Sequence, residues 1–438
     1  MTSQSLTKEH FYRTKFDRIE NGKCGVAWLQ MLRENAIDHY SAVGFPTVKN
    51  EDWKYTNVAA IAEKSFDLVS ANEAFETEKL QPFFYDEARS SQLVFINGKL
   101  DSESSAIADL PPGVLIKSLA EAFGDETVCD LIKEHLARLV NYNSNGFTAL
   151  NTAFLNDGAF VFVPKNTKIE APIHLLFAAT AESAAAFPRV LVILEQGAEA
   201  TLVETYARTK EVEYLTNSVV EIVLADDARL THYRVQRESH AAYHIGTTGV
   251  NLERSFYDST NITLGAALSR HDVNVKFNSE GGEAFVDGLY LVSDTQHADT
   301  HSTIDHAVPN CASHQTYKGI LDGKSRAVFN GKVFVRDGAR GTDAQQSNKN
   351  LLLSNDARVD TKPQLEIFND DVKCAHGATV GQLEDEEVFY LLSRGLSPEL
   401  TRNLLTYGFA EGIVNKIEIE SIKKQLDAAV LKRLEANF

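Results

Sequence analysis

A cysteine and a histidine two residues apart are the side chains of this 438-residue chain whose types and spacing are best suited to chemistry. Cys374 and His376 lie in Val372–His376, whose pattern predicts a short strand. Because side chains alternate along a strand, both should face the same side. Sulfur and imidazole are ligands for soft metals or sulfur species. Two ligands do not complete a tetrahedral site, so further ligands must come from elsewhere in the fold or from another chain. The same spacing also fits an inert, half-buried cysteine beside a hydrogen-bonded histidine.

The elements that must position this pair are a strand before it and a helix after it. Residues 364–368 alternate loosely between polar and apolar, which predicts a strand, and residues 369–371 form a turn. Gly377 is expected to end the strand that carries the pair, and a run punctuated by glycine follows as far as Gly381. Acidic residues 384–387 then favour the start of a helix that closes at Gly395.

The last part of the chain is predicted to be a small helical domain, residues 383–438. Ser397 and Pro398 form an N-cap and a first-turn proline. Two apolar stripes at helical spacing follow, and most of their residues are expected to pack against each other and against the strands. The stripes consist of Leu400, Leu404, Leu405, Phe409, Ile413 and Val414, and of Ile422, Leu426, Val430 and Leu434.

Residues 1–146 are predicted to form a mainly helical, mixed domain. Apolar residues at three- and four-residue spacing indicate helices before Gly44 and Pro46. A strand is expected at 93–96 with a turn at Asn97-Gly98, and short helices at 119–123 and 128–139. The segment Glu51–Thr56, EDWKYT, is interpreted as a tryptophan anchor surrounded by ion pairs.

Residues 147–382 are predicted to be all β. Strand-length segments alternate with turn residues here, and so many strands cannot form one open sheet. A sandwich, a barrel or a β-helix remains, and short strands with brief turns favour a solenoid. The predicted strands are 160–163, 173–177, 190–194, 200–206, 218–223, 229–236, 273–277, 284–292, 327–335 and 350–354.

Composition and the absence of common motifs narrow the classes of function open to this chain. The formal net charge of -18 opposes binding to nucleic acid. No apolar run is long enough to span a membrane, and the N-terminal residues lack the apolar core of a signal peptide, so a cytoplasmic protein is expected. Four cysteines, at 24, 129, 311 and 374, share no spacing that indicates disulfides or a self-contained zinc site. The sequence also lacks GxSxG, P-loop and Rossmann motifs, so an ATPase partner must supply energy if energy is needed.

Several segments carry a family resemblance. KPQLEI, DDVKCAHGATVG and VFYLLSRGL resemble the SufB/SufD family, scaffold subunits of the SUF iron–sulfur cluster assembly system, and its SufD branch in particular. YKGILDGKSRAVFNGKVFVRDGA and DAQQSNKNLLLS extend the match over the C-terminal half, whereas EDWKYT is the main match near the N-terminus. Asn310 stands where the family often has histidine, and Ala375 replaces a common serine.

The resemblance implies a mainly β protein, with a right-handed parallel β-helix core between N- and C-terminal helical domains. It implies a non-catalytic scaffold subunit that pairs with SufB and docks the SufC ATPase. His376, and more weakly Cys374, would bind iron or a nascent cluster at the SufB interface. No tightly bound cofactor is expected in the isolated chain, only transient iron or a cluster shared with SufB. The implied partner-binding residues are Glu384, Phe389, Tyr390, Arg394, Leu400, Leu404 and Phe409.

Other interpretations stay open from sequence. The chain could be the paralogue SufB, although its CAHGATVG segment argues against this. It could be a β-helix enzyme acting on polysaccharide, with carboxylates converging on the sugar. Cluster type, flavin involvement and a homodimer of the isolated chain are undecided. Acids available to such an enzyme are Asp287, Asp294, Asp299 and Asp305, and a histidine-rich segment of undecided role holds His297, His301, His306 and His314.

Overall fold

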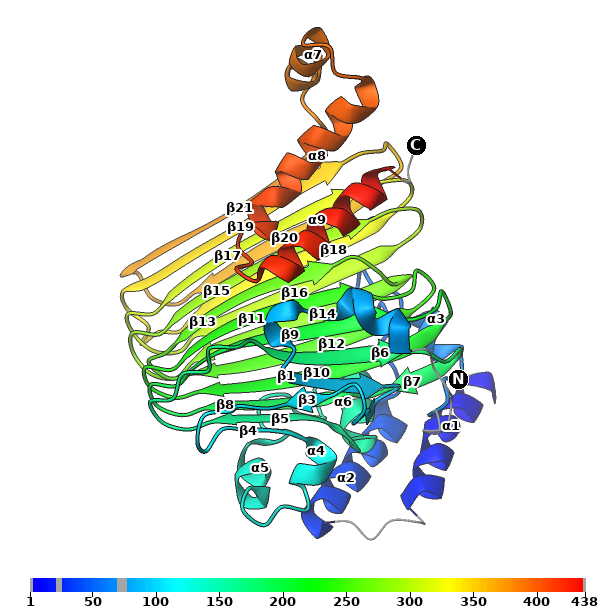
Figure 1. Cartoon of the computed structure of the whole chain (residues 1–438), viewed down its shortest axis with the longest axis vertical. Coiled ribbons are helices and arrows are strands. Elements are labelled where there is room, and N and C mark those ends of the chain that lie inside the picture. Colours follow the sequence, from blue (N-terminus) through cyan, green and yellow to red (C-terminus); the bar gives the residue numbers. More distant parts are fainter. Residues whose placement is uncertain (1–2, 21–25, 69–76, 436–438) are drawn as a thin grey trace.

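The chain is a parallel β-solenoid with helices before and after it, as a computed structural model that describes residues 3–20, 26–68 and 77–435 shows (Figure 1). Along the solenoid, successive strands alternate between two sheets, here called sheet A and sheet B. The predicted fold class, a mainly β parallel solenoid flanked by helices, is confirmed. The boundaries of the three predicted domains, 1–146, 147–382 and 383–438, stay predictions.

Both sheets are parallel except at their first strands, where β1 pairs antiparallel with β2 and β3, and β4 with β5. The order in sheet A is β4-β5-β8-β10-β12-β14-β16-β18-β20, with β7 beside β10; the order in sheet B is β2-β1-β6-β9-β11-β13-β15-β17-β19-β21, with β3 beside β1. Sheet A consists of β4 Leu115–Ser118, β5 Gly158–Val163, β7 Ala184–Ala186, β8 Arg189–Leu194, β10 Tyr214–Leu224, β12 Tyr243–Leu252, β14 Leu268–Phe277, β16 His297–His306, β18 Arg326–Val335 and β20 Arg358–Ile367. Sheet B consists of β1 Ser91–Ile96, β2 Lys99–Leu100, β3 Ala106–Ile107, β6 Ile173–Ala179, β9 Glu199–Arg208, β11 Arg229–Arg237, β13 Phe256–Thr263, β15 Glu283–Val292, β17 Ala312–Leu321, β19 Thr342–Leu352 and β21 Val372–Gly381.

Helices cover the outer faces of the two sheets unequally. Those of the N-terminal part pack on sheet A near its first strands, whereas α8 and α9 pack on the middle of sheet B. Helix α7 projects past the last strands (Figure 1). None of the helices in the described ranges is long and apolar enough to cross a bilayer. The helices are α1 Ser3–Glu20, α2 Ala27–Val43, α3 Ala59–Ala62, α4 Leu119–Ala122, α5 Cys129–His135, α6 Gly146–Ala153, α7 Asp385–Ser393, α8 Pro398–Val414 and α9 Glu420–Glu435, with 3₁₀ turns at Glu51–Trp53, Thr77–Phe83 and Asp86–Ala88.

The strands of each sheet stack in register, so inward side chains form columns along the solenoid axis. Alternate residues of β19 are buried, as a strand with one face toward the core requires. The register of the ladder continues one such column from Gln315 on β17 through Gln346 on β19 to His376 on β21. A large apolar cluster fills most of the interior. The side chains of each turn therefore rest on those of the turn before it.

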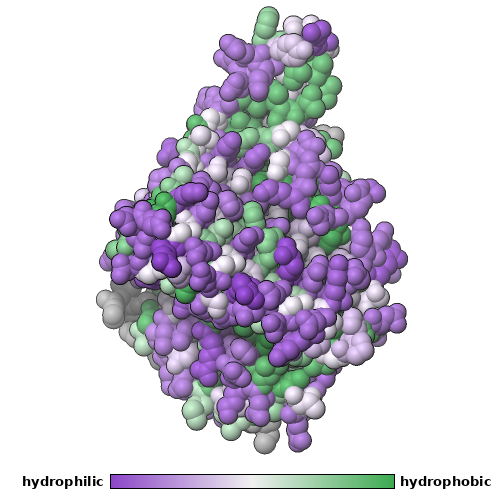
Figure 2. Space-filling view, turned by 90° about the vertical axis from the view of Figure 1, so that its left-hand side faces the viewer, coloured by the Kyte–Doolittle hydropathy of each residue, from purple (hydrophilic) through white to green (hydrophobic). Residues whose placement is uncertain are grey.

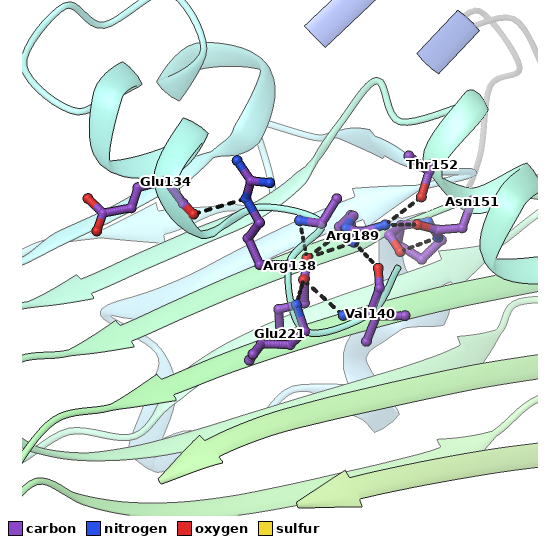
Figure 3. A network of polar contacts seen from close by, with 10 residues as sticks. Glu134, Arg138, Val140, Asn151, Thr152, Arg189 and Glu221 are labelled. Atoms are coloured by element: carbon purple, nitrogen blue, oxygen red, sulfur yellow. Dashed lines mark hydrogen bonds and ion pairs between the residues drawn. The ribbon is translucent and has the colours of Figure 1, made fainter. Parts of the chain in front are cut away.

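A fully buried ion pair fixes the segment before α6 to the outer face of sheet A. The Arg189 guanidinium donates to Glu221 Oε2 at 2.7 and 3.0 Å, and both side chains are 0 % exposed (Figure 3). The remaining Arg189 donors reach side chains of α6 and the Val140 carbonyl. Glu221 accepts from the backbone N–H groups of residues 137, 139 and 140. A buried charge is costly unless its hydrogen-bonding groups are paired, and here the groups of both side chains have partners.

The EDWKYT segment is a structural anchor, as its sequence predicted. Trp53 is buried, and its ring stacks on Phe147 at a centroid distance of 5.4 Å. The Arg270 guanidinium lies 3.8 Å from the tryptophan ring centroid and is held by Asp272 and Asp299. A cation over an indole, itself paired with carboxylates, attaches this N-terminal turn to sheet A.

Some local predictions were wrong. The strand that carries the cysteine and histidine does not end at Gly377, because in-register pairing with β19 carries it to Gly381. The predicted helix over 128–139 is shorter, since α5 ends at His135 and the following residues turn toward Glu221. Strands β12, β13 and β17 were missed, because their polar residues hid the alternation. The turn at Asn97-Gly98 is confirmed, with positive φ at both residues. Cys24 lies outside the described residues.

Replacing Glu221 by Gln should lower the free energy of unfolding by about 3 kcal/mol, because Arg189 would keep its buried charge without a counter-charge. Urea denaturation of the full chain, followed by circular dichroism, measures the change. The matched control is Asp227→Asn, which breaks the exposed ion pair with Arg254 and should leave the midpoint unchanged. Equal midpoints for Glu221→Gln and the unaltered chain would contradict the assigned role.

Candidate functional site

The solenoid ends in two strands that each have a neighbour on one side only. β20 pairs with β18 and β21 pairs with β19, and none of the other described strands pairs with their free edges. Along β20 every residue is half-buried or exposed, and along β21 most residues are exposed. A free edge with unpaired backbone groups is a template for another strand. This end of the molecule is called the open end below.

Cys374 and His376 lie on the open end, on the same side of β21, as predicted. They are in register with the buried Ala344 and Gln346 of β19, so both belong to the inward face of the solenoid. His376 is exposed there, because no further turn of the solenoid covers it. Cys374 is half-buried against Val333 and its neighbours. Burial raises the pKa of the Cys374 thiol, which keeps it protonated at neutral pH.

Below His376 lies a ladder of two glutamine side chains. Gln346 Nε2 donates to Gln315 Oε1 at 2.7 Å, and the Ser302 hydroxyl donates to the same oxygen at 3.2 Å. All three residues are buried. Sequence inspection singled out the cysteine and the histidine but not these glutamines, because only the register shows that they share a column with His376.

The interior of the solenoid is accessible at the open end. A hollow of about 750 Å³ borders Val359 on β20 and Val380 on β21, and Val380 is 48 % exposed. Charged side chains at its rim include Arg326 and Asp360, which pair with each other at 2.6 Å. Apolar groups that are normally covered in a solenoid thus face outward here.

The proline of β20 does not weaken the ladder. The Arg358 N–H donates to the carbonyl of Ser325, just before β18, and the Phe368 N–H donates to Val335 on β18. The backbone groups of even-numbered residues of β20 therefore point toward β18, and those of odd-numbered residues point toward the free edge. Pro363 therefore lacks an N–H only where the strand has no neighbour. Proline is confined to such edge positions in sheets.

A second exposed surface lies on the projecting helices. We call it the α7–α8 surface, and Figure 2 shows hydrophobic residues gathered on this projecting end. No α7 residue is buried. Exposed apolar residues of this extent indicate an interaction site. The α7–α8 surface comprises Phe389 (73 % exposed), Tyr390 (55 %), Leu392 (37 %), Leu400 (54 %) and Leu404 (48 %).

The remaining residues predicted to bind partners occupy different environments. Glu384 is the exposed residue before the first turn of α7, and Arg394 lies over the Tyr390 ring at 5.1 Å. Phe409 is half-buried instead, with Lys318 Nζ 5.0 Å from its ring centroid and 2.9 Å from its carbonyl oxygen. Phe409 thus attaches α8 to sheet B and is not part of the exposed surface. Leu400 and Leu404, which the resemblance placed among the partner-binding residues, are exposed, whereas Ile413 and Val414 of the same stripe are buried.

Acidic groups on sheet B help to seat the C-terminal helices. Asp287 on β15 forms an ion pair with Lys416, which follows α8. Asp258 on β13 lies near these two residues. Burial, together with the neighbouring Asp287 charge, raises the pKa of Asp258 to about 6. Deprotonation of Asp258 therefore places a second negative charge beside Asp287.

The histidine-rich segment does not form a metal site. His301 and Asp305 face outward on β16 and His306 faces inward, as the alternation predicted. His306 bonds Ser313 Oγ at 2.8 Å, and burial lowers its pKa to about 4. Over the described ranges of the chain, no group of three or more His, Cys, Asp or Glu side chains is placed to hold a metal ion. The other members make structural contacts: His297 with Thr56, His301 with Asp299, and His314 stacked on Phe285.

The acids considered for a polysaccharide-cleaving enzyme do not converge. Asp287 faces outward on sheet B beneath Lys416. Asp299 and Asp305 face outward on sheet A, where they pair with Arg270 and Arg336 respectively. Asp294 is in the turn before β16. Carboxylates on opposite sheets cannot flank one glycosidic bond.

The fold and these two surfaces define a class: a parallel β-solenoid with an open strand end and an exposed apolar helical surface. Comparison with known families assigns residues 177–409 to the SUF system FeS cluster assembly SufBD core domain and residues 3–175 to the SufBD protein N-terminal region. The chain belongs to the SufBD family of iron–sulfur cluster assembly proteins.

Similar proteins span most of the chain. An iron–sulfur cluster assembly SufBD family protein of Synechocystis is 37 % identical over 91 % of this chain and 89 % of its own length. The iron–sulfur cluster assembly protein SufD of Escherichia coli is 30 % identical over 89 % of this chain and 90 % of its own. SufD of Bacillus subtilis is 26 % identical over 93 % and 94 %. The resemblance seen in the sequence is therefore confirmed.

Asp258→Asn should stabilise the chain above pH 6 and have little effect near pH 4. The folded pKa of about 6 lies above the usual value of about 3.9, so the stabilising contribution of protonated Asp258 is lost as pH rises through 6. Thermal melting at pH 4 and pH 8 checks this, with Asp370→Asn in an exposed turn as control. A stabilisation of equal size at both pH values would contradict the assigned pKa.

Proposed function

We propose that this chain acts as the SufD-type scaffold subunit of a SUF complex, pairing with a SufB subunit through the open end. The observation that carries the proposal is the position of His376, exposed on the inward face of the last strand beside a free edge. Membership of the iron–sulfur cluster assembly family supports iron or a nascent cluster as the cargo. A homodimer of the isolated chain follows from the same free edges, since a second copy can also pair with them.

In this proposal His376 binds iron, or a cluster under assembly, as cargo. A neutral imidazole offers one nitrogen lone pair to iron, and a partner subunit completes the coordination sphere. Cys374 is a secondary ligand, because its protonated, half-buried thiol must first lose a proton. Covering the open end with a partner also excludes water, which strengthens every electrostatic contact to the bound metal.

The α7–α8 surface is proposed to dock the SufC ATPase. The chain has no phosphate-cradling motif of its own, so nucleotide hydrolysis has to come from a partner. Aromatic residues such as Phe389 and Tyr390 are enriched among residues that dominate binding energy at protein interfaces. The exposure of these rings on projecting helices supports this assignment.

His376→Ala should abolish iron and sulfide in the purified complex while SufB and SufC still copurify with the chain. The substitution removes one ligand from an exposed position and leaves the backbone edge intact. Coexpression with both partners, anaerobic purification and iron measurement provide the test.

His314→Ala is the matched histidine control, because His314 faces outward on sheet B and stacks on Phe285. This control should keep the iron. Normal iron and sulfide in the His376→Ala complex would refute the role of His376.

Phe389→Asp should weaken SufC binding by at least about thirtyfold, since buried interface aromatics commonly contribute about 2 kcal/mol or more. SufB should still copurify, because the open end is unchanged. Leu431→Asp, which alters an exposed leucine on α9, is the control and should retain SufC. If both variants bind SufC as the unaltered chain does, the ATPase docks elsewhere.

A further inference from the structure

The inward column that ends in His376 contains a buried acceptor with no donor. Gln346 lies one strand below His376 in the same register, about 4.8 Å away along the stack. The Gln346 side chain is 4 % exposed. The Gln346 Nε2 donates to Gln315 Oε1. Within the described residues, no group donates to Gln346 Oε1. A buried oxygen without a donor costs free energy unless another state of the protein satisfies it.

The Gln346 amide occupies a space that the opposite sheet leaves for it. Gly331 on β18 faces the column across the interior, and a Cβ added there would lie 2.3 Å from Gln346 Nε2. A glycine at this position therefore leaves room for the amide where it donates to Gln315, on the neighbouring strand of its own sheet. Pro363 and Ser302 are the residues in register on either side of Gly331. The position of the amide is thus built into both sheets.

The orientation of the ladder favours a free oxygen at its upper end. The Ser302 hydroxyl donates to Gln315 Oε1, and Gln346 Nε2 donates to that same oxygen. With Gln315 oriented in this way, turning the Gln346 amide alone by 180° would bring two carbonyl oxygens together. The group of Gln346 left for a neighbour in the column is consequently an acceptor.

We propose, on the basis of the proposed function above, that Gln346 is a positioning residue for His376. A neutral imidazole has one N–H donor and one lone pair. When a partner covers the open end, the His376 ring N–H donates to Gln346 Oε1. The other ring nitrogen then presents its lone pair to iron. A hydrogen bond of this kind fixes both the tautomer and the direction of a ligating histidine.

The decisive experiment compares Gln346→Met with Gln346→Glu in the complete complex with SufB and SufC. Methionine keeps the length of the side chain but removes the acceptor, whereas glutamate keeps an acceptor and adds a buried charge. Gln315 can turn its unpartnered Nε2 toward that glutamate. Each complex is purified anaerobically, and the iron retained is titrated with an iron chelator.

A positioning role and a purely packing role for Gln346 predict opposite orders of iron affinity for the methionine and glutamate variants. For a positioning residue, Gln346→Met should lower the apparent iron affinity about tenfold, while Gln346→Glu stays close to the unaltered complex. A residue that only packs the core would tolerate methionine and suffer from glutamate, and this order would overturn the proposal. Gln345→Met is the matched control, because Gln345 is the exposed neighbour on the outer face of the same strand, and it should keep full affinity.

Further outcomes separate this proposal from the function on which it rests. Iron retained in His376→Ala overturns both. Iron lost in His376→Ala but fully retained in Gln346→Met overturns only the positioning role. If Gln346→Met does not assemble with its partners, Gly331→Ala replaces it, since the added methyl group displaces the intact amide. Loss of iron affinity in Gly331→Ala then supports the proposal, and unchanged affinity contradicts it.

Discussion

In-register parallel stacking is the constraint on which the rest of this structure depends. Each strand is aligned with its neighbour residue for residue, so a side chain on one turn determines what can lie on the next. Gly331 illustrates this, because its missing side chain on one sheet makes room for Gln346 on the other. A slip of one residue would turn every inward side chain outward. The same register that packs the core therefore also places the ligands at the end of the stack.

Two clusters of buried charge on the outer face of sheet A attach flanking segments to the solenoid. Arg189 and Glu221 tie a loop and α6 to sheet A, and Arg270 ties the EDWKYT segment to the same sheet. Charged groups this deep are expensive unless every donor and acceptor is used. In both clusters the guanidinium donors reach carboxylates and backbone carbonyls. Such clusters specify where an attachment sits, because no other position satisfies the same set of groups.

Local patterns predicted an all-β core and singled out the cysteine and histidine, and the family resemblance implied the parallel β-helix, but neither showed how the pair is supported. Cys374 and His376 stood out because their types and alternation were visible locally. Gln346 did not, because its importance comes from a column that joins residues about thirty positions apart, and only the pairing of strands defines it. Likewise, polar strands such as β12 show little alternation in sequence, yet ladder pairing on both sides makes them regular.

Helical spacing alone left the exposure of Leu400 and Leu404 open, whereas the family resemblance placed both among the partner-binding residues. An apolar stripe on a helix predicts burial, but it does not say whether the chain itself or another protein provides the cover. In this fold the second half of α8 rests on sheet B and the first half extends past it. The helix is simply longer than the surface beneath it.

Pro363 gives the free edge of β20 an uneven supply of donors. A strand that approaches this edge finds N–H groups at residues 359, 361, 365 and 367 but none at the centre. An incoming strand whose carbonyl lies opposite Pro363 receives no hydrogen bond there. A strand whose carbonyl at that position accepts a hydrogen bond from another group is not weakened. A single proline thus restricts which strands can pair with the end of the solenoid, and it disfavours aggregation through the free edge.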